Sequence, residues 1–230
     1  MPEGPRIAPV GALVGDPARA NILTVLLDGK ARTATELSCI AGVSPQTTSA
    51  HLSKLVQGKL IGLEKLGRNR YFRLTSHTVA EAIEALVRVA DDAQHPKRST
   101  CPRDEALRLA RTCYDHIAGQ LGVALMDSLS GHGHLVELNT GLALSDQGER
   151  YLRNLGVDID GIRQRRRPFA RTCLDWSEHR PHLAGALGAA LAARCFSLRW
   201  IEHLPDSRAL KVTARGRDGL SKAFGVEPPS

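Results

Sequence analysis

TATELSCIAGVSPQTTSAHLSKLVQ, residues 33–57, contains two short helical patterns separated by a turn at Gly42. In the first pattern, apolar residues recur every three or four positions and end at Ala41. The second pattern opens with Ser44 and Pro45, a helix-capping side chain followed by proline at the first helical position. Glycine allows the tight turn that joins two such helices. The stretch therefore predicts a helix-turn-helix.

A β-hairpin is predicted directly after these helices. Residues 60–66 and 70–74 alternate apolar and polar side chains on either side of a Gly-Arg-Asn turn. Further helical patterns lie on both sides of residues 33–74. The pattern before residue 33 begins at Asp16, which is its predicted cap. We therefore expect a winged helix-turn-helix domain over residues 13–92, preceded by a loose tail over residues 1–12.

The outward face of the predicted 44–57 helix is polar. Its apolar face is expected to be buried, which leaves small polar side chains free to approach base edges in a major groove. Basic side chains at the hairpin tip can reach phosphates. A three-helix core with a solvated basic face would explain the charge alone, but the spacing, the polar helix and the basic hairpin together favour DNA binding. The predicted DNA contacts are Ser44, Gln46, Thr47, Ser49, His51 and Lys54 on the helix and Arg68, Asn69 and Arg70 at the tip.

Four sequence words carry a resemblance to a known family: Gly15-Asp16-Pro17-Ala18-Arg19, Thr35-Glu36-Leu37, Val43–Leu55 and Gly67–Leu74. Over residues 13–90 the chain resembles the ArsR/SmtB family of winged-helix regulators. The resemblance implies a homodimeric bacterial repressor that leaves its double-stranded operator DNA when an effector binds. It also implies that the polar residues of the 44–57 helix face DNA and that Arg68 and Arg70 form the wing tip. Dimer contacts are expected from the helix that begins at Asp16 and from the 78–90 helix, with the C-terminal half as an alternative.

The C-terminal half contains a repeat. ARTCYD at residues 110–115 recurs as ARTCLD at residues 170–175, and IAGQLGVAL at residues 117–125 recurs as LAGALGAAL at residues 183–191. A short apolar pair, a turn, a strand-like run and a small helix follow each copy, which indicates two copies of one unit. The closely spaced glycines are expected to allow close approach between helices.

The predicted fold class is mainly α with small β-hairpins (α+β). A winged helix-turn-helix is expected to be followed by a linker, residues 93–102, and by a duplicated helix–hairpin–helix (winged-helix-like) domain, residues 103–230. The two repeats are expected at residues 103–160 and 163–228.

Metal or thiol sensing is one interpretation of the repeated word. The first copy brings Cys113 with Asp115 and His116, and the second brings Cys173 with Asp175, His179 and His182. Thiolate and imidazole together suit zinc or a thiophilic metal ion. The alternative is that both cysteines are small buried residues at equivalent positions. No cofactor is required by the sequence, and a bound metal ion is the open alternative. The predicted sensing residues are Cys113, His116, Cys173 and His179.

Composition and the absence of known motifs argue against a membrane protein and against an enzyme. A net charge of +7 over 230 residues permits an anionic partner, and five cysteines without CxxC spacing favour reduced thiols in a cytoplasm. No apolar run is long enough for a membrane span, so no membrane partner is expected. Nucleotide-binding and hydrolase motifs are absent, which argues against an enzyme. Two alternatives to a regulator remain, a winged-helix protein-interaction module and an enzyme that carries a winged-helix appendage.

Overall fold

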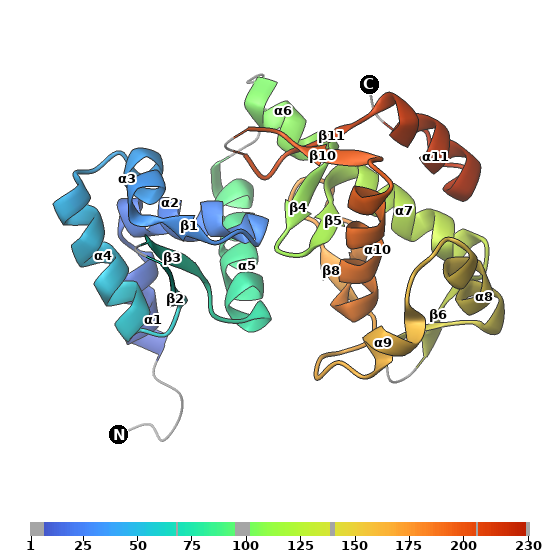
Figure 1. Ribbon diagram of the computed structural model, residues 1–230, viewed down its shortest axis with the longest axis horizontal. Coiled ribbons are helices and arrows are strands. Elements are labelled where there is room, and N and C mark those ends of the chain that lie inside the picture. Colours follow the sequence, from blue (N-terminus) through green and yellow to red (C-terminus); the bar gives the residue numbers. More distant parts are fainter. Residues whose placement is uncertain (1–6, 68, 95–101, 139–140, 206, 229–230) are drawn as a thin grey trace. The chain divides into compact units, whose positions relative to one another are not determined.

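The computed structural model describes residues 7–67, 69–94, 102–138, 141–205 and 207–228 (Figure 1). Its contacts divide the chain into two compact units, Met1–Leu86 and Val87–Ser230. The division falls within helix α5 (His77–Gln94), so the expected boundary between residues 92 and 93 lies later in the same helix. Most of the expected linker, residues 95–101, lies outside the described residues.

The first unit combines helices with one small sheet. Its elements, in chain order, are α1 (Ile7–Val14), α2 (Pro17–Val25), the 3-10 helix η1 (Leu26–Asp28), β1 (Arg32–Thr33), α3 (Ala34–Ala41), α4 (Pro45–Gln57), β2 (Ile61–Leu66), β3 (Asn69–Leu74) and the first part of α5. β2 and β3 form the predicted antiparallel hairpin, and β1 joins it in the order β1-β3-β2. The winged helix-turn-helix is therefore confirmed. β1 was not predicted, because two residues are too few to show the alternation of a strand.

Local interactions explain where α2 and α4 begin. Asp16 caps α2 by accepting a hydrogen bond from the Arg19 N–H at 3.0 Å, and Ser44 caps α4 by accepting one from the Thr47 N–H at 3.2 Å. Gly42 adopts a φ of 66° at the end of α3, a left-handed conformation that glycine takes without strain. The predicted caps and turn are therefore present, and they fix where α4 starts relative to α3.

α4 turns one face toward the core of the first unit. Thr48, Leu52 and Leu55 are buried, and Val56 is half-buried. These residues face α2, α3 and β2, which α4 contacts. The opposite face of α4 therefore remains open to solvent.

The expected loose tail is wrong for residues 7–12, which belong to helix α1. Pro9 does not break this helix because it lies in the first turn, where its missing N–H is not needed. α1 has no buried residues. Among the described residues, no single helix is long and apolar enough to cross a membrane. Ile7–Val14 and Pro17–Asp28 meet that test only as a pair, which is bent by 89° at the break.

The second unit repeats one order of elements: hairpin, helix, hairpin, helix. After α6 (Pro102–Leu109), the first run is β4 (Arg111–Cys113), β5 (His116–Ala118), α7 (Gly119–Gly131), β6 (Leu135–Leu138), β7 (Gly141–Leu144) and α8 (Asp146–Asn154). α9 (Ile159–Arg163) precedes the second run, which is β8 (Arg171–Leu174), β9 (Pro181–Ala184), α10 (Gly185–Ser197), β10 (Ile201–His203), β11 (Leu210–Val212) and α11 (Ala214–Phe224). Each hairpin is a two-stranded sheet, and the fold class is mixed α and β as predicted.

Each run begins with a hairpin rather than with the expected helix. Cys113 pairs with His116 across a turn in which Tyr114 has a φ of 59°. In the second run Cys173 pairs with His182. Strands of three or four residues are too short for their alternation to be recognised in the sequence.

Glycines on the two long helices allow close approach to the hairpins, not the helix–helix approach expected from their spacing. A Cβ built at Gly122 would overlap the carbonyl oxygen of Ile117 and lie 3.4 Å from the Cβ of His182. A Cβ at Gly188 would overlap the Leu183 carbonyl oxygen in the same way. Each long helix is therefore held against the strand that leads into it.

Gly122→Ala is expected to lower the free energy of unfolding by about 1–3 kcal/mol, because a methyl group there meets backbone that cannot move aside. Gly131→Ala in the same helix is the control, since its Cβ would meet no atom within 4 Å. Alanine is favoured over glycine in a helix by ~1 kcal/mol, so the control should be neutral or slightly stabilising. Urea denaturation of both variants measures the difference. Equal stability of the two would contradict the close approach.

Candidate nucleic-acid interface and a cysteine–histidine cluster

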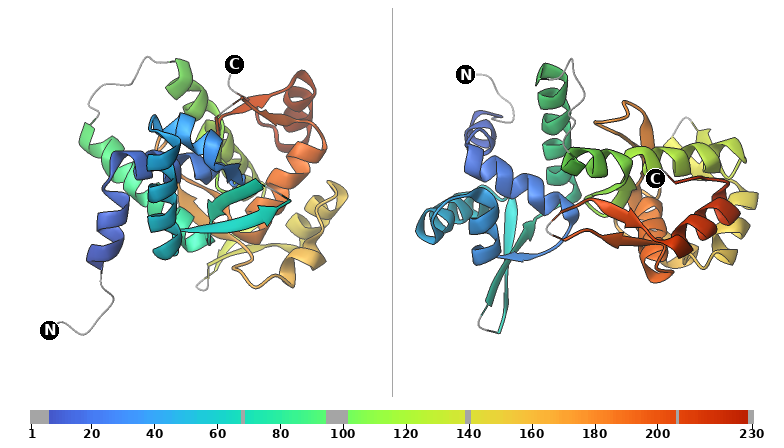
Figure 2. Two further views of the ribbon diagram at one scale, coloured as in Figure 1. Left: turned by 60° about the vertical axis from the view of Figure 1, so that its left-hand side comes forward. Right: turned by 90° about the horizontal axis from the view of Figure 1, so that it is seen from above.

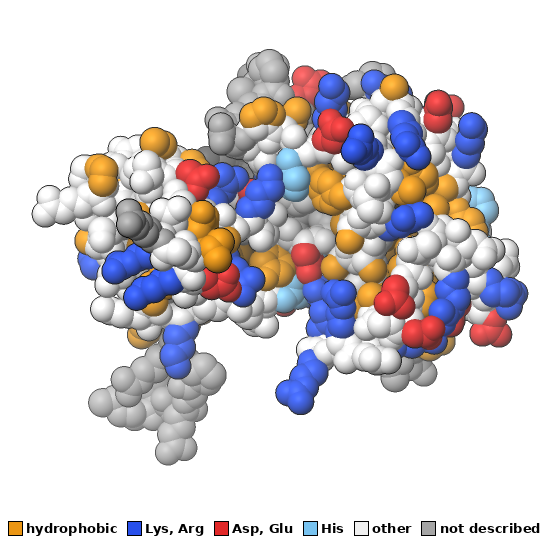
Figure 3. Space-filling view, in the orientation of Figure 1, with side chains coloured by type: hydrophobic (Ala, Val, Ile, Leu, Met, Phe, Trp, Pro, Cys, Tyr) orange, Lys and Arg blue, Asp and Glu red, His pale blue; other side chains and the backbone are white. Residues whose placement is uncertain are grey.

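The open face of α4 carries most of the residues predicted to contact DNA. Gln46, Thr47, Ser49 and Lys54 are exposed, as is the capping residue Ser44. Their side chains are short or flexible and polar, so the helix can approach the edges of bases closely. Lys and Arg side chains also lie over α4 on the face of the first unit that Figure 3 shows.

His51 differs from the other predicted contacts on α4. Its side chain is 14% exposed, and its Nδ1 lies 3.3 Å from Nη1 of Arg19 and 3.7 Å from Oδ1 of Asp16. These contacts hold the ring against the start of α2. The structure therefore places His51 at the edge of the open face, in contact with the start of α2.

The β2–β3 hairpin forms the wing and projects beyond the helices of the first unit (Figure 2). Asn69 and Arg70 are exposed, and Lys65 lies directly opposite Arg70 in the strand register. Two like charges at facing positions destabilise a hairpin on its own, whereas an anion between or beside them removes the repulsion. Arg68, the remaining predicted wing residue, lies outside the described residues.

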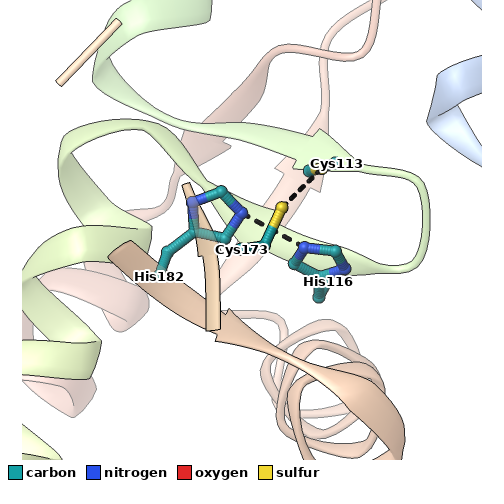
Figure 4. Close-up of side chains that lie close together, drawn as sticks. All are labelled: Cys113, His116, Cys173 and His182. Carbon is teal, nitrogen blue, oxygen red and sulfur yellow. Dashed lines mark hydrogen bonds between the residues drawn. The ribbon is translucent and has the colours of Figure 1, made fainter. Parts of the chain in front are cut away.

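A second candidate site lies between the first hairpins of the two runs. It consists of four side chains whose donor atoms all lie within 4.8 Å of one another: Cys113, His116, Cys173 and His182. Each copy of the repeat supplies two of them. The two sulfur atoms are 3.9 Å apart and the two Nε2 atoms are 3.1 Å apart. In Figure 4, one dashed line joins Cys173 to Cys113 and another joins the rings of His116 and His182. We call this group the Cys–His cluster.

A carboxylate backs each histidine of the Cys–His cluster. Nδ1 of His116 lies 3.3 Å from Oδ1 of Asp115, and Nδ1 of His182 lies 3.2 Å from Oδ2 of Asp175. Burial would raise the pKa of both carboxyl groups, but their hydrogen bonds and nearby positive charges outweigh it and lower both values, to about 2 for Asp115. Both carboxylates are therefore ionised when they contact the rings.

An arginine in turn pairs with each carboxylate. Nη1 of Arg167 lies 2.5 Å from Oδ2 of Asp115, and Nη2 of Arg111 lies 2.9 Å from Oδ1 of Asp175. Arg111 and Asp175 are both fully buried and come from different runs. The cluster is therefore surrounded by neutralised ion pairs.

The surroundings of Cys173 favour its thiolate form. The hydrogen bond with Cys113 lowers the pKa of Cys173 despite its burial, and His116 acts in the same direction. Cys195, which is buried in α10 away from these groups, shows the contrast, because burial raises its pKa to about 12.

The structure brings together three of the four predicted sensing residues and replaces the fourth. His179 lies exposed on the loop between β8 and β9 and is not in the Cys–His cluster, whereas His182 lies on β9 opposite Cys173. The signal for His182 was present in the repeat. The offset of 66 residues that relates 117–125 to 183–191 also relates His116 to His182.

Residues 14–63 match a family model described as a helix-turn-helix domain. The uncharacterized HTH-type transcriptional regulator YdfF of Bacillus subtilis (strain 168) is 40% identical over 223 residues, which is 97% of this chain and 99% of that protein.

Two solved structures are similar to the N-terminal part. The homodimeric winged helix-turn-helix DNA-binding domain of Mb0332 from Mycobacterium bovis, a possible ArsR-family transcriptional regulator, is 23% identical and covers 44% of this chain and 99% of its own, with a TM-score of 0.37. The cadmium sensor CmtR of Mycobacterium tuberculosis is 29% identical and covers 41% and 99%, with a TM-score of 0.32. With YdfF matched along its full length and a winged helix-turn-helix in its first unit, this chain belongs to the same family of HTH-type transcriptional regulators as YdfF.

Proposed function

We propose that the chain is a sequence-specific, dimeric repressor, not an enzyme, which binds double-stranded operator DNA in the cytoplasm and leaves it when an effector binds. The observation that carries this proposal is the open polar face of α4 beside a basic wing. Gln46, Thr47 and Ser49 would read base edges in the major groove. Arg70 and Asn69, with Arg68, would hold the backbone beside it.

Exposed apolar side chains support the dimer. Ile7 and Val10 in α1 are 83% and 43% exposed, and Leu86 and Val89 in α5 are 48% and 65% exposed. Large apolar side chains left in solvent commonly mark protein–protein contacts. We therefore assign the contact between protomers to α1 and α5. α2, which was also expected there, buries Ile22 and its neighbours in the core of its own unit.

The second unit would receive the effector. We propose that its two runs are copies of one unit, because the same word forms the first strand of each, at β4 and β8. The Cys–His cluster lies where these copies meet and offers thiol and imidazole groups. A metal ion, a thiol-reactive species or a small molecule acting there could change the affinity for DNA.

Lys65→Ala/Arg70→Ala is expected to weaken binding to the operator and to unrelated DNA alike, and to reduce the slope of log affinity against log salt by about 2. Each basic side chain that contacts a phosphate releases roughly one counterion, which is why two losses are expected. Fluorescence anisotropy with DNA from the region upstream of the gene measures both effects. Lys211→Ala/Lys222→Ala removes the same charge from exposed positions in the second unit and is the control. A slope that stays unchanged in the wing variant would favour a protein-interaction module.

Gln46→Ala is expected to change which base is preferred at one operator position, by about 1–3 kcal/mol of discrimination. The amide can form two hydrogen bonds with one base, and alanine forms none. A set of operators substituted one base pair at a time measures the preference. Gln57→Ala, at the other end of α4, is the matched control. If both variants keep the wild-type base preference, α4 does not read bases through Gln46.

A further inference from the structure

We propose that one divalent metal ion of the zinc class binds in the second unit between the two hairpins, held by two cysteines and two histidines: Cys113, His116, Cys173 and His182. This inference goes beyond the proposed function, because metal binding can be measured without DNA. It rests on the placement of the donor atoms, their burial and their charge.

The distances between donor atoms fit a tetrahedral zinc site. With Zn–S near 2.3 Å and Zn–N near 2.0–2.1 Å, tetrahedral angles place the two sulfurs about 3.8 Å apart and the two nitrogens about 3.3 Å apart. The structure has 3.9 Å between the sulfurs of Cys113 and Cys173 and 3.1 Å between the Nε2 atoms of His116 and His182. Small side-chain adjustments would therefore complete the coordination.

The hairpins place these donors by strand pairing. Cys113 faces His116 across β4–β5, and Cys173 faces His182 across β8–β9. Each hairpin thus supplies one sulfur and one nitrogen. A site of this kind joins the two copies through equivalent residues.

The charge balance favours a divalent ion. Two thiolates and two neutral imidazoles around a 2+ ion give a neutral group, which can be buried without an uncompensated charge. His116 and His182 are each 1% exposed, so an unbalanced charge among them would be unfavourable. The two carboxylates nearby do not disturb this balance, because each already pairs with an arginine.

The carboxylates also orient the rings. Nδ1 of His116 is hydrogen-bonded to Asp115, and Nδ1 of His182 lies 3.2 Å from Oδ2 of Asp175, so a proton on each Nδ1 would leave the lone pair of each Nε2 directed into the cluster. Histidine ligands in metal sites are held in this way. Two small buried cysteines, the alternative interpretation, would not require either the facing imidazoles or their carboxylate partners.

Cobalt titration of the full-length, reduced protein tests the proposal. We expect one Co²⁺ per chain, with the visible bands of a tetrahedral site and a thiolate-to-cobalt charge-transfer band, and displacement of Co²⁺ by Zn²⁺. His182→Asn should weaken binding by about 100-fold or more, since loss even of a group that only supports a ligand weakens metal binding 10–100-fold. Cys173→Ser should remove or weaken the charge-transfer band.

Matched controls separate the site from general effects. His179→Asn replaces a histidine that lies three positions away, and asparagine tolerates the φ of 52° found there, so its cobalt affinity should equal that of the wild type. Cys39→Ser removes an exposed cysteine of the first unit and should have no effect. Far-ultraviolet circular dichroism checks that each variant is folded. If a variant does not fold, the cobalt titration of the wild-type protein still tests the metal site.

Two results would overturn the proposal. One is a reduced wild-type chain that shows no thiolate–cobalt band at one equivalent of Co²⁺. If mild oxidation of that chain then removes the thiols of Cys113 and Cys173 together, the two cysteines form a disulfide and do not hold a metal ion. The other is a folded His182→Asn variant whose cobalt affinity matches that of His179→Asn.

Discussion

Asp175→Asn is expected to lower the free energy of unfolding by about 3–5 kcal/mol. The Asp175 carboxylate is fully buried and accepts hydrogen bonds from Nη2 of Arg111 at 2.9 Å and from the Gly119 N–H at 2.7 Å. It also accepts from the N–H and the hydroxyl of Ser177, each at 2.9 Å. Replacing the carboxylate by an amide leaves the buried Arg111 guanidinium without its counter-charge, and the amide nitrogen cannot accept a hydrogen bond.

The location of Asp175 makes this loss larger than that of an ordinary ion pair. Arg111 comes from the first run and Asp175 from the second, so the pair holds the two hairpins together. The guanidinium carbon of Arg111 also lies 4.6 Å from the centre of the Trp176 ring, which keeps the charge away from water. In the variant, water therefore cannot take the place of the Asp175 carboxylate beside the Arg111 guanidinium.

Urea denaturation in the presence of a chelator measures this prediction, because the chelator removes any contribution from bound metal. Asp127→Asn is the control, since Asp127 pairs with Arg180 at 2.8 Å but both side chains are about half exposed. Exposed pairs contribute about 0–1 kcal/mol, so the control should change little. A loss of less than 1 kcal/mol for Asp175→Asn would show that the buried pair is not needed to hold the hairpins together.

The first unit could be predicted from its sequence because its signals are local. Asp16, Ser44 and Gly42 each act within a few residues, as caps or as a turn, and the wing strands are long enough to alternate. The position of His51 could not be predicted in this way. Helical periodicity places it at the edge of the polar face, and only the contact with Arg19 on α2 decides where the ring lies.

The Cys–His cluster shows the limit of sequence distance as a guide. Asp115 and Asp175 are related by an offset of 60 residues, but His116 and His182 are related by an offset of 66. The turn between β4 and β5 is short, whereas the loop between β8 and β9 spans residues 175–180 and contains the extra residues. Nearness in sequence favoured His179, whereas strand pairing brings His182 to Cys173.

Zinc is expected to change the operator affinity of the wild-type protein by about 5–150-fold, the usual range for coupling between two sites, and to leave a Cys113→Ser/Cys173→Ser variant unchanged. This prediction depends on both the proposed function and the metal site. The double variant keeps two side chains of similar size but removes both thiolate ligands, so α4 and the wing are untouched. Fluorescence anisotropy with operator DNA, at zinc concentrations set by a metal buffer, gives the two affinities.

Thermodynamic linkage provides the decisive check on this coupling. If zinc weakens operator binding by a given factor, operator DNA must weaken zinc binding by the same factor, so zinc affinities measured by displacement of cobalt with and without DNA must agree with the anisotropy. Wild-type protein that never binds the operator would refute the proposed function. Wild-type protein that binds cobalt and DNA without either affecting the other would leave the metal site intact and assign it to holding the two hairpins together. Release of DNA by zinc from the double variant would place the effector site elsewhere, because that variant lacks both sulfur ligands.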